Sequence, residues 1–319
     1  MNFKNADILT AEQFDKGSLV KLFKKAEEME KLIKGQRVGR KGAGTKGFSK
    51  LMDGKIMATL FYEPSTRTRF SFETAFLRLG GRVISGADMA NTSSAKKRES
   101  LGDTGKVVSR FADVIVMRHP SPGSVEDLAS VASVPVINAG DGPHQHPTQG
   151  LLDMYTIWKE FKGKLDGKTI GMVGDLKNGR VPPSLCNLSK HWDMKYVFVA
   201  PKGLEIQKEA KNDLVGASRE FREEMILDQA IGEMDVILMT RLQEERFLTK
   251  KEAEKYQGVY ILTPELMRKA KKSSIVIHPL PRVDEITKRV DEDPRAKYFD
   301  QVENGVAVRM ALLAMVLRS

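Results

Sequence analysis

Three hydroxyl side chains and two arginines lie together in the run Ser65-Thr66-Arg67-Thr68-Arg69. The apolar run 56–62 before it is typical of a buried strand, and the residues after it repeat with helical spacing. A helix start presents unpaired backbone N–H groups and the positive end of the helix dipole. The run therefore predicts a site for an anion such as phosphate. The alternative is a Ser/Thr cap followed by solvated arginines, although a cap needs only one of these side chains.

Other polar and basic residues follow other predicted strands. Arg118 comes directly after the strand predicted at 113–117, and His146 and Gln149 follow the strand predicted at 134–138. The remaining clusters occupy 93–97, 174–180, 239–243 and 278–282. Ligands of open parallel sheets bind outside the carboxyl ends of the strands, so these clusters are predicted to form the site. The histidine pair at 144 and 146 is a weak metal signal, and no metal site is predicted.

Alternating strands and helices must position these residues. Strands are predicted at 56–62, 82–86, 113–117, 134–138, 168–174, 195–200, 234–240 and 274–278, with amphipathic segments in most of the gaps. This rhythm predicts an α/β protein of two domains, each a parallel β-sheet flanked by helices. Helices are predicted at 11–34, at 151–161 as a domain connector, and at 304–317. A GxGxxG match at 42–47 lies in an expected loop, 35–50, and precedes a strand, so it is not read as a dinucleotide fingerprint.

Composition narrows the class of protein. The 319 residues are 41% hydrophobic and carry a net charge of +10, spread along the chain without a recognisable nucleic-acid module. No apolar run is long enough to span a membrane, and the first residues lack the apolar core of a signal peptide. Cys186 is the single cysteine, in an apolar helical context that predicts a buried, inert thiol. We expect an intracellular protein with small anionic substrates, binding neither nucleic acid nor membrane.

Seven motifs in this order closely resemble the catalytic chain of the aspartate carbamoyltransferase family. They are 65–69, 93–97, 117–120, 138–149, 174–176, 239–243 and 278–285, and the resemblance covers essentially the whole chain. It implies transfer of the carbamoyl group of carbamoyl phosphate to L-aspartate, giving N-carbamoyl-L-aspartate and phosphate in pyrimidine synthesis. It also implies a homotrimer with active sites at subunit boundaries, and no cofactor. The expected domains are 1–148, completed by helix 303–319, for carbamoyl phosphate, and 149–302 for aspartate.

The resemblance also implies residue roles. Ser65, Thr66, Arg67 and Thr68 would bind the phosphate, Arg118 and His146 the carbamoyl oxygen, and Gln149 the amide. Ser93 and Lys97 would come from the neighbouring subunit, with Lys97 contacting both substrates. The acceptor's carboxylates would meet Arg180, Arg241 and Gln243, and the carbonyls of Leu280 and Pro281 would receive the carbamoyl amide and the incoming amine. Arg67, Thr68, Lys97, Arg118 and His146 are the expected catalytic residues.

Two other functions stay open from the sequence. A transcarbamoylase for another acceptor such as ornithine shares the first motif, but arginines at 180 and 241 suit a dicarboxylic acceptor better than a cationic one. A non-catalytic relative is the second. A separate regulatory chain and a nucleotide effector also stay open. The sequence departs from the family at Arg98 and Asn178, and in a long 35–50 loop. A cytoplasmic location is expected, with a mature organellar form as the alternative.

Overall fold

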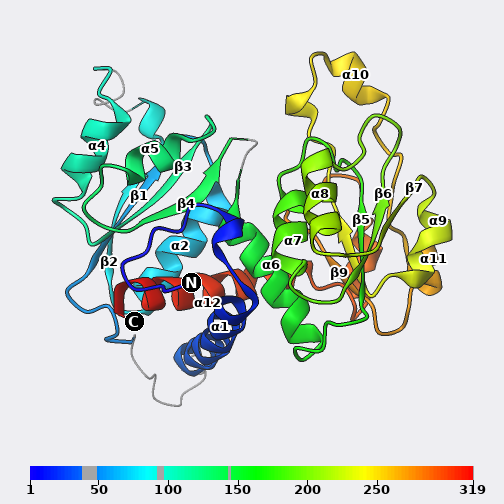
Figure 1. The fold of residues 1–319 in the computed structure, drawn as a ribbon, viewed down its shortest axis with the longest axis horizontal. Coiled ribbons are helices and arrows are strands. Elements are labelled where there is room, and N and C mark those ends of the chain that lie inside the picture. Colours follow the sequence, from blue (N-terminus) through cyan, green and yellow to red (C-terminus); the bar gives the residue numbers. More distant parts are fainter. Residues whose placement is uncertain (38–48, 92–96, 143–144, 319) are drawn as a thin grey trace. The chain divides into compact units, whose positions relative to one another are not determined.

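The computed structural model describes residues 1–37, 49–91, 97–142 and 145–318 (Figure 1). The chain divides into two compact units, the first formed by Met1–Leu151 with Glu303–Ser319 and the second by Leu152–Val302. Each unit is a parallel sheet flanked by helices, which confirms the predicted fold class. The first division falls inside helix α6 (Pro147–Glu160), a few residues beyond the expected boundary after residue 148.

The first unit is built on a four-stranded sheet in the order β2-β1-β3-β4. Its strands are β1 (Ile56–Phe61), β2 (Arg82–Gly86), β3 (Val114–His119) and β4 (Val136–Asp141). Its helices are α1 (Lys16–Arg37), α2 (Thr66–Arg78), α4 (Leu101–Val108), α5 (Ser124–Ala129), the start of α6 and most of α12 (Tyr298–Arg318), with 3-10 turns η1 (Ala11–Gln13) and η3 (Met89–Asn91). Strands β1, β3 and β4 are almost wholly buried, whereas β2, at one edge of the sheet, is mainly exposed.

A buried arginine joins three helices of the first unit. Arg309, in the apolar helix α12, is only 3% exposed. Its Nη1 donates to Ser71 Oγ on α2 at 3.0 Å, and its Nη2 donates to Thr148 Oγ1 on α6 at 3.4 Å. The guanidinium also lies 4.8 Å from the ring centre of Phe72. The C-terminal helix therefore fixes the two helices that carry the phosphate-site motif and the His146-Pro147-Thr148-Gln149 motif.

The second unit is built on a five-stranded parallel sheet in the order β7-β6-β5-β8-β9. Its strands are β5 (Thr169–Val173), β6 (Lys195–Val199), β7 (Phe221–Glu224), β8 (Val236–Met239) and β9 (Ile275–Ile277). Its helices are α7 (Val181–Ser189), α8 (Lys208–Gly216), α9 (Leu227–Ala230), α10 (Lys250–Glu254) and α11 (Pro264–Lys269), with 3-10 turns η4 (Ile231–Glu233), η5 (Glu244–Arg246) and η6 (Lys288–Glu292). A continuous apolar cluster packs against this sheet.

The structure differs from the sequence-based expectation at several element boundaries and in one strand. The helix expected at 304–317 begins at Tyr298, and the one expected at 11–34 begins at Lys16 after a 3-10 turn. Strand β7 was not predicted, because its sequence FREE is mostly charged and its strand lies at the sheet edge. The expected loop from residue 35 begins later, since α1 continues through Arg37; the glycine-rich motif at 42–47 lies outside the described residues. Helix α6 begins at Pro147 rather than 151, with proline in the first turn, where its missing N–H is not needed.

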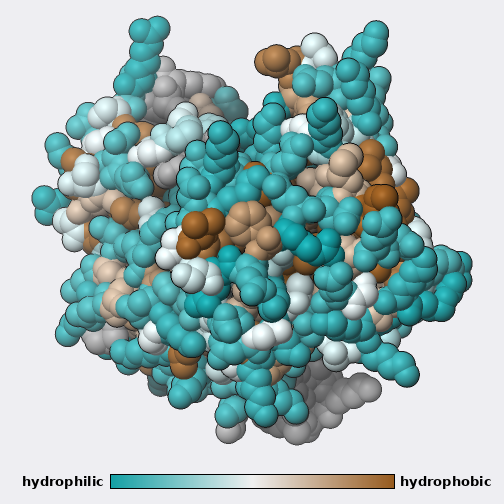
Figure 2. Space-filling view, turned by 45° about the vertical axis from the view of Figure 1, so that its right-hand side comes forward, coloured by the Kyte–Doolittle hydropathy of each residue, from teal (hydrophilic) through white to brown (hydrophobic). Residues whose placement is uncertain are grey.

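The surface and the single cysteine agree with the composition. The face drawn in Figure 2 is mainly hydrophilic, with scattered apolar groups. Cys186 is fully buried, and burial raises the pKa of its thiol far above the ordinary value, as expected for an inert side chain. Over the part of the chain that the structure describes, none of the helices combines the length and apolar character needed to span a bilayer.

Candidate active site

The element predicted to bind an anion is the start of helix α2, which follows strand β1. Ser65 is the N-cap, with extended backbone (φ −156°, ψ 94°), and within the described structure its side chain makes no capping bond. By contrast Ser100, Thr249 and Thr263 each accept a hydrogen bond from a backbone N–H of the helix they precede. Ser65 therefore occupies the N-cap position without the side-chain hydrogen bond of an ordinary cap, and its hydroxyl does not satisfy a backbone N–H of the helix start.

The first residues of α2 place hydroxyl and guanidinium donors at this helix start. Thr66 and Arg67 are exposed, whereas Thr68 is buried at 8% exposure. Arg69 turns sideways, where its Nη1 donates to Ser85 Oγ on β2 at 3.3 Å. The backbone N–H of Arg69 bonds to the Ser65 carbonyl, so the helix is regular from its first turn. Exposed donors and a helix dipole at one point suit a phosphate group.

Arg118 lies on β3, immediately beside the end of β1. The sheet register pairs it with Phe61, and its carbonyl accepts the N–H of Tyr62 at 2.8 Å. The guanidinium is 8% exposed; its Nη2 lies 2.9 Å from Glu63 Oε2, and its Nη1 donates to the Ala139 carbonyl at 3.3 Å. A buried guanidinium requires such partners. They hold this cation at the carboxyl ends of adjacent strands.

The chain between β4 and α6 places His146 and Gln149. The Asp141 carboxylate accepts N–H groups of Gly123 and Gln145, and the N–H of Gly142 donates to the His119 carbonyl at 2.8 Å. His146 follows, 5% exposed, and its carbonyl accepts the N–H of Gln149 at 3.0 Å in the first turn of α6. The described residues before and after 143–144 are thus each held by hydrogen bonds.

Strand order brings most of the expected carbamoyl phosphate residues together. Because β1, β3 and β4 are consecutive in the sheet, their carboxyl ends are neighbours, and these ends carry the α2 start, Arg118 and the His146–Gln149 turn. Lys97 lies exposed in a turn beside Arg98, whose φ is 60°. Ser93 lies outside the described residues. The first unit therefore gathers hydroxyl, arginine and histidine side chains at three neighbouring strand ends.

In the second unit, Asp175 joins two loops that sequence reasoning treated separately. Its carboxylate accepts the backbone N–H of Asn178 at 3.0 Å, the Asn178 side-chain amide at 3.1 Å and the backbone N–H of Gln243 at 3.1 Å. The preceding Gly174 has φ 119°, and a Cβ there would lie 2.4 Å from the Thr240 carbonyl oxygen. Glycine is thus required where the ends of β5 and β8 approach each other.

The arginines expected to bind the acceptor follow these strands. Arg180 is half-buried at the N-cap of α7, whose first turn carries the prolines after Val181. Arg241 Nη1 donates to Glu245 Oε2 at 3.0 Å, Nη2 pairs with Oε1 of the same carboxylate, and Nη2 lies 3.4 Å from Gln243 Oε1. The hydrogen bonds from Arg241 hold the pKa of Glu245 below its ordinary value. Both terminal nitrogens of Arg241 are thus engaged by the Glu245 carboxylate, in the bidentate geometry that arginine forms with carboxylates.

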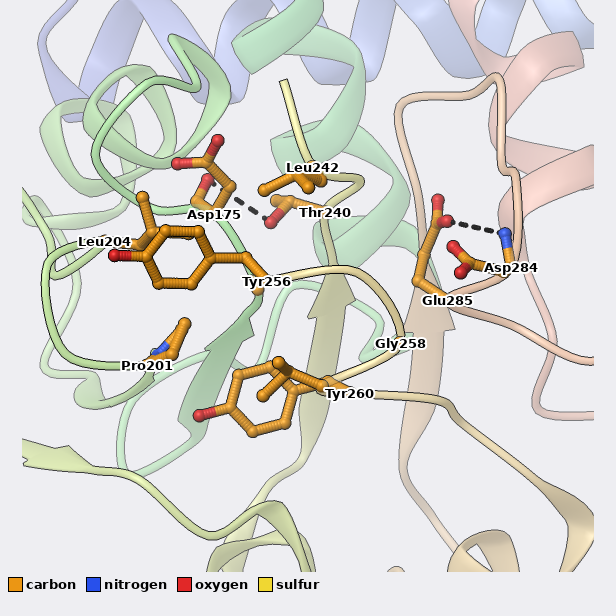
Figure 3. A pocket seen from close by; sticks show the side chains of 12 residues that line it. Asp175, Pro201, Leu204, Thr240, Leu242, Tyr256, Gly258, Tyr260, Asp284 and Glu285 are labelled. Atoms are coloured by element: carbon orange, nitrogen blue, oxygen red, sulfur yellow. Dashed lines mark hydrogen bonds between the residues drawn. The ribbon is translucent and has the colours of Figure 1, made fainter. Parts of the chain in front are cut away.

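The loop after β9 carries Leu280 and Pro281, joined by a cis peptide bond. Leu280 has φ 55°, a left-handed conformation that costs a non-glycine residue of order 1–3 kcal/mol. The loop ends at Glu285, which lies with Asp284 beside a small cleft. Tyr256, Tyr260 and Asp175 line other parts of this cleft, where the strands β5 and β8 end (Figure 3).

Four carboxylates, one in the first unit and three in the second, had no role in the sequence interpretation. Glu63 pairs with Arg118, Glu245 pairs with Arg241, Asp175 binds two loops, and Glu285 closes the loop after β9. Sequence signals could have indicated two of the four. Glu63 lies beside the predicted phosphate motif, and Glu245 is four residues from Arg241. In the described ranges, groups of three His, Cys, Asp or Glu side chains spaced for a metal ion are absent.

Together the fold and these clusters define a two-unit α/β protein with anion-binding groups at the carboxyl ends of its parallel strands. Residues 6–159 match the carbamoyl-P binding domain of the aspartate/ornithine carbamoyltransferase family. Its Asp/Orn binding domain matches residues 166–316. The chain belongs to the aspartate/ornithine carbamoyltransferase family.

Relatives and solved structures are similar over nearly the full length. The aspartate carbamoyltransferase catalytic subunit of Clostridium novyi is 50% identical, over 85% of this chain and 89% of its own. The chloroplastic aspartate carbamoyltransferase of Arabidopsis thaliana is 45% identical, over 99% of this chain and 78% of its own. The structure of the M. jannaschii aspartate transcarbamoylase catalytic subunit aligns with a TM-score of 0.87 at 44% identity, over 97% and 96% of the chains. The structure of Trypanosoma cruzi aspartate transcarbamoylase in complex with carbamoyl phosphate aligns with a TM-score of 0.89 at 37% sequence identity. The alignment covers 99% of this chain and 97% of that chain.

Proposed function

We propose that this chain transfers the carbamoyl group of carbamoyl phosphate to the amino group of L-aspartate. The products are N-carbamoyl-L-aspartate and phosphate, in the de novo synthesis of pyrimidines. The observation that carries the proposal is the open start of α2 beside the buried Arg118, in a chain whose relatives are named aspartate carbamoyltransferase. The helix start suits a phosphate group, and the buried guanidinium next to it suits the carbonyl oxygen attached to that phosphate.

We assign carbamoyl phosphate to the first unit, expected as 1–148 with 303–319. Ser65, Thr66, Arg67 and Thr68 bind the phosphate, because they combine backbone N–H groups, hydroxyls and a guanidinium at one helix start. Arg118 and His146 contact the carbamoyl oxygen, and Gln149 contacts the amide. Ser93 and Lys97 of a neighbouring subunit complete the site, and the exposure of Lys97 leaves it accessible to such a role.

We assign L-aspartate to the second unit, expected as 149–302. Arg180, Arg241 and Gln243 receive its two carboxylates, with Lys97 of the neighbouring subunit as a further cation. Asp175 supports this assignment, because it bonds to the loops that carry these side chains. The carbonyls of Leu280 and Pro281 accept hydrogen bonds from the carbamoyl amide and from the incoming amine. A dicarboxylic acceptor uses the two arginines, whereas a cationic acceptor such as ornithine gains nothing from them.

In the reaction, the unprotonated amine of aspartate attacks the carbamoyl carbon. The C=O electrons move to the oxygen, and the resulting negative charge is stabilised by Thr68, Arg118 and His146. The C–O bond to phosphate then breaks, phosphate leaves toward Arg67 and the α2 start, and the amine proton is lost to the departing phosphate. Positioning of two anionic substrates by cations contributes up to about 7–11 kcal/mol to such a bimolecular step. The proposed scheme requires neither a metal nor a covalent intermediate.

The proposal includes a homotrimer with shared active sites. Phe70 and Leu77 lie one above the other on α2 and are 52% and 46% exposed, and Ile84 on the neighbouring edge strand β2 is 44% exposed. Exposed apolar side chains that gather around a free sheet edge support a surface that another copy of the chain covers. A trimer is expected by light scattering, and a monomer of full activity would contradict this part of the proposal.

We place the reaction in the cytoplasm. The plant relatives are named chloroplastic, so a mature organellar enzyme is the alternative. The two locations are distinguished by imaging the tagged full-length protein in its own cell.

A product assay tests the proposed reaction. Purified protein is incubated with carbamoyl phosphate and L-aspartate, and both carbamoyl aspartate and phosphate are measured. We expect the two products in equal amounts and only when both substrates are present. Phosphate release that does not depend on the acceptor, or no turnover by a folded oligomer, would contradict the assignment.

A further inference from the structure

His278 is a buried histidine with three defined hydrogen bonds. It follows strand β9 and is only 1% exposed. Its backbone N–H donates to Gln301 Oε1 at 2.9 Å, its Nδ1 accepts the N–H of Leu280 at 2.7 Å, and its Nε2 lies 2.6 Å from Glu285 Oε1. Both ring nitrogens therefore contact the same short loop, one near its start and one at its end.

These contacts fix the tautomer of the ring. The Leu280 N–H is only a donor, so Nδ1 must carry a lone pair, and the proton of the neutral ring lies on Nε2. Nε2–H then donates to the Glu285 carboxylate, whose other oxygen accepts the N–H groups of Val283 and Asp284 at 3.0 and 3.1 Å. Burial would raise the pKa of Glu285, but the bonds from His278 and the backbone outweigh it and lower the pKa. Glu285 is thus an acceptor.

The residue held by Nδ1 is the one with the unusual backbone. Leu280 has φ 55°, and the direction of its carbonyl depends on keeping that conformation. The bond from its N–H to His278 Nδ1 anchors the peptide unit directly before this φ rotation. If Leu280 left the left-handed region of φ and ψ, its carbonyl would point in a different direction. The imidazole is therefore placed to hold one carbonyl in one direction.

We propose that His278 is a positioning residue for carbamoyl transfer: its Nδ1 holds the Leu280 backbone so that the Leu280 carbonyl faces the reacting groups, and Glu285 selects the tautomer that allows this. The inference rests on the proposed function, which assigns a substrate contact to that carbonyl. A histidine that only filled the core would matter through its volume and its number of hydrogen bonds. The positioning role instead depends on one ring nitrogen.

Two variants separate the two ring nitrogens. His278→Asn places an amide oxygen where Nδ1 lies, so the Leu280 acceptor is kept and the Glu285 donor is lost. His278→Gln reaches the Nε2 position, so the Glu285 donor is kept and the Leu280 acceptor is lost. Asparagine is the smaller side chain and leaves the larger cavity, so His278→Asn is expected to be the less stable variant. The proposal nevertheless predicts that it is the more active one.

The test compares thermal stability with kinetics for the wild type and both variants. We expect kcat/KM to be about tenfold or more lower in His278→Gln than in His278→Asn, the effect of one well-placed hydrogen bond. The melting temperatures should have the opposite order. Inhibition by inorganic phosphate should be unchanged, because its site lies in the first unit. Activities that follow stability, or equal activities, would overturn the role of His278. An inactive wild type would instead contradict the proposed function.

Discussion

Arg118 and Glu63 form an ion pair at the carboxyl end of β3, with 2.9 Å between Nη2 and Oε2. Glu63 lies between the end of β1 and the start of α2, so the pair connects Arg118 to the helix that we propose binds phosphate. Arg118 is nearly buried, and its orientation depends on this carboxylate and on the Ala139 carbonyl.

Replacing Glu63 by glutamine keeps an acceptor but removes the charge that orients Arg118. We expect kcat/KM for carbamoyl phosphate to fall by about tenfold, because the neutral amide no longer attracts the guanidinium that the nearby carboxylate holds in place. Steady-state kinetics with varied carbamoyl phosphate measures this. Glu126→Gln, an exposed residue on α5, is the control. Equal kinetics for the two variants would show that the pair does not orient Arg118.

Arg67→Ala tests the phosphate end of the site. We expect the rate to fall by at least about 100-fold, by comparison with loss of an oxyanion donor, while the protein stays folded because Arg67 is exposed. The measurements are turnover and circular dichroism. Arg110→Ala removes an exposed arginine of the same unit and should leave turnover unchanged. Near-normal turnover in Arg67→Ala would reject the phosphate assignment.

Arg241→Gln tests the acceptor site. Loss of a bidentate charged contact should raise KM for aspartate by about tenfold or more, and binding of carbamoyl phosphate alone should be unchanged. Arg246→Gln, at an exposed position of the same loop, is the matched control. Kinetics with varied aspartate, together with calorimetric titration of carbamoyl phosphate, distinguish the outcomes. An unchanged KM for aspartate would place the acceptor elsewhere.

Asp235 provides a stability prediction away from the site. Burial would raise its pKa, but hydrogen bonds from Lys271, the Thr169 N–H and Lys168 outweigh burial and lower the pKa below 3.8. A depressed carboxyl pKa stabilises the fold above the unfolded-state pKa, and this contribution is lost as pH falls through the folded-state pKa.

Asp235→Asn should therefore cost about 1–3 kcal/mol of unfolding free energy at pH 7. The difference from wild type should shrink as pH falls below about 4, where the unfolded carboxyl takes up its proton. Urea unfolding across this pH range measures both quantities. Asp228→Asn removes a carboxylate from an exposed pair with Lys269 and should change stability by less than about 1 kcal/mol. A pH-independent difference for Asp235→Asn would contradict the explanation.

Local patterns were enough to predict most of the fold. Buried strands such as 56–61 are short apolar runs, and the start of α2 is visible as hydroxyls and arginines directly after one of them. Charged edge strand β7 has no such signal, because only one side of it is paired and little of it is buried. The end of α1 was predicted too early because Gly35 was assigned to the glycine-rich loop, although a single glycine costs a helix only about 1 kcal/mol.

The cationic side chains of the candidate site could be predicted from the sequence, but the carboxylates that hold the site's side chains and loops could not. A cluster such as 65–69 carries its chemistry in consecutive residues, so type and spacing identify it. Asp175 acts on Gln243 across 68 residues of sequence, and no local pattern reports that contact. The tautomer of His278 likewise depends on Glu285 and on the backbone direction of Leu280, which only three-dimensional structure supplies.

The most direct test of the central claim is a competition between acceptors. Carbamoyl phosphate labelled with carbon-13 in the carbamoyl group is given to the purified protein with equal concentrations of L-aspartate and L-ornithine, and both products are quantified by NMR. We predict that nearly all the label enters carbamoyl aspartate, and that Arg241→Gln lowers that product selectively. Label entering mainly citrulline would contradict the proposed acceptor.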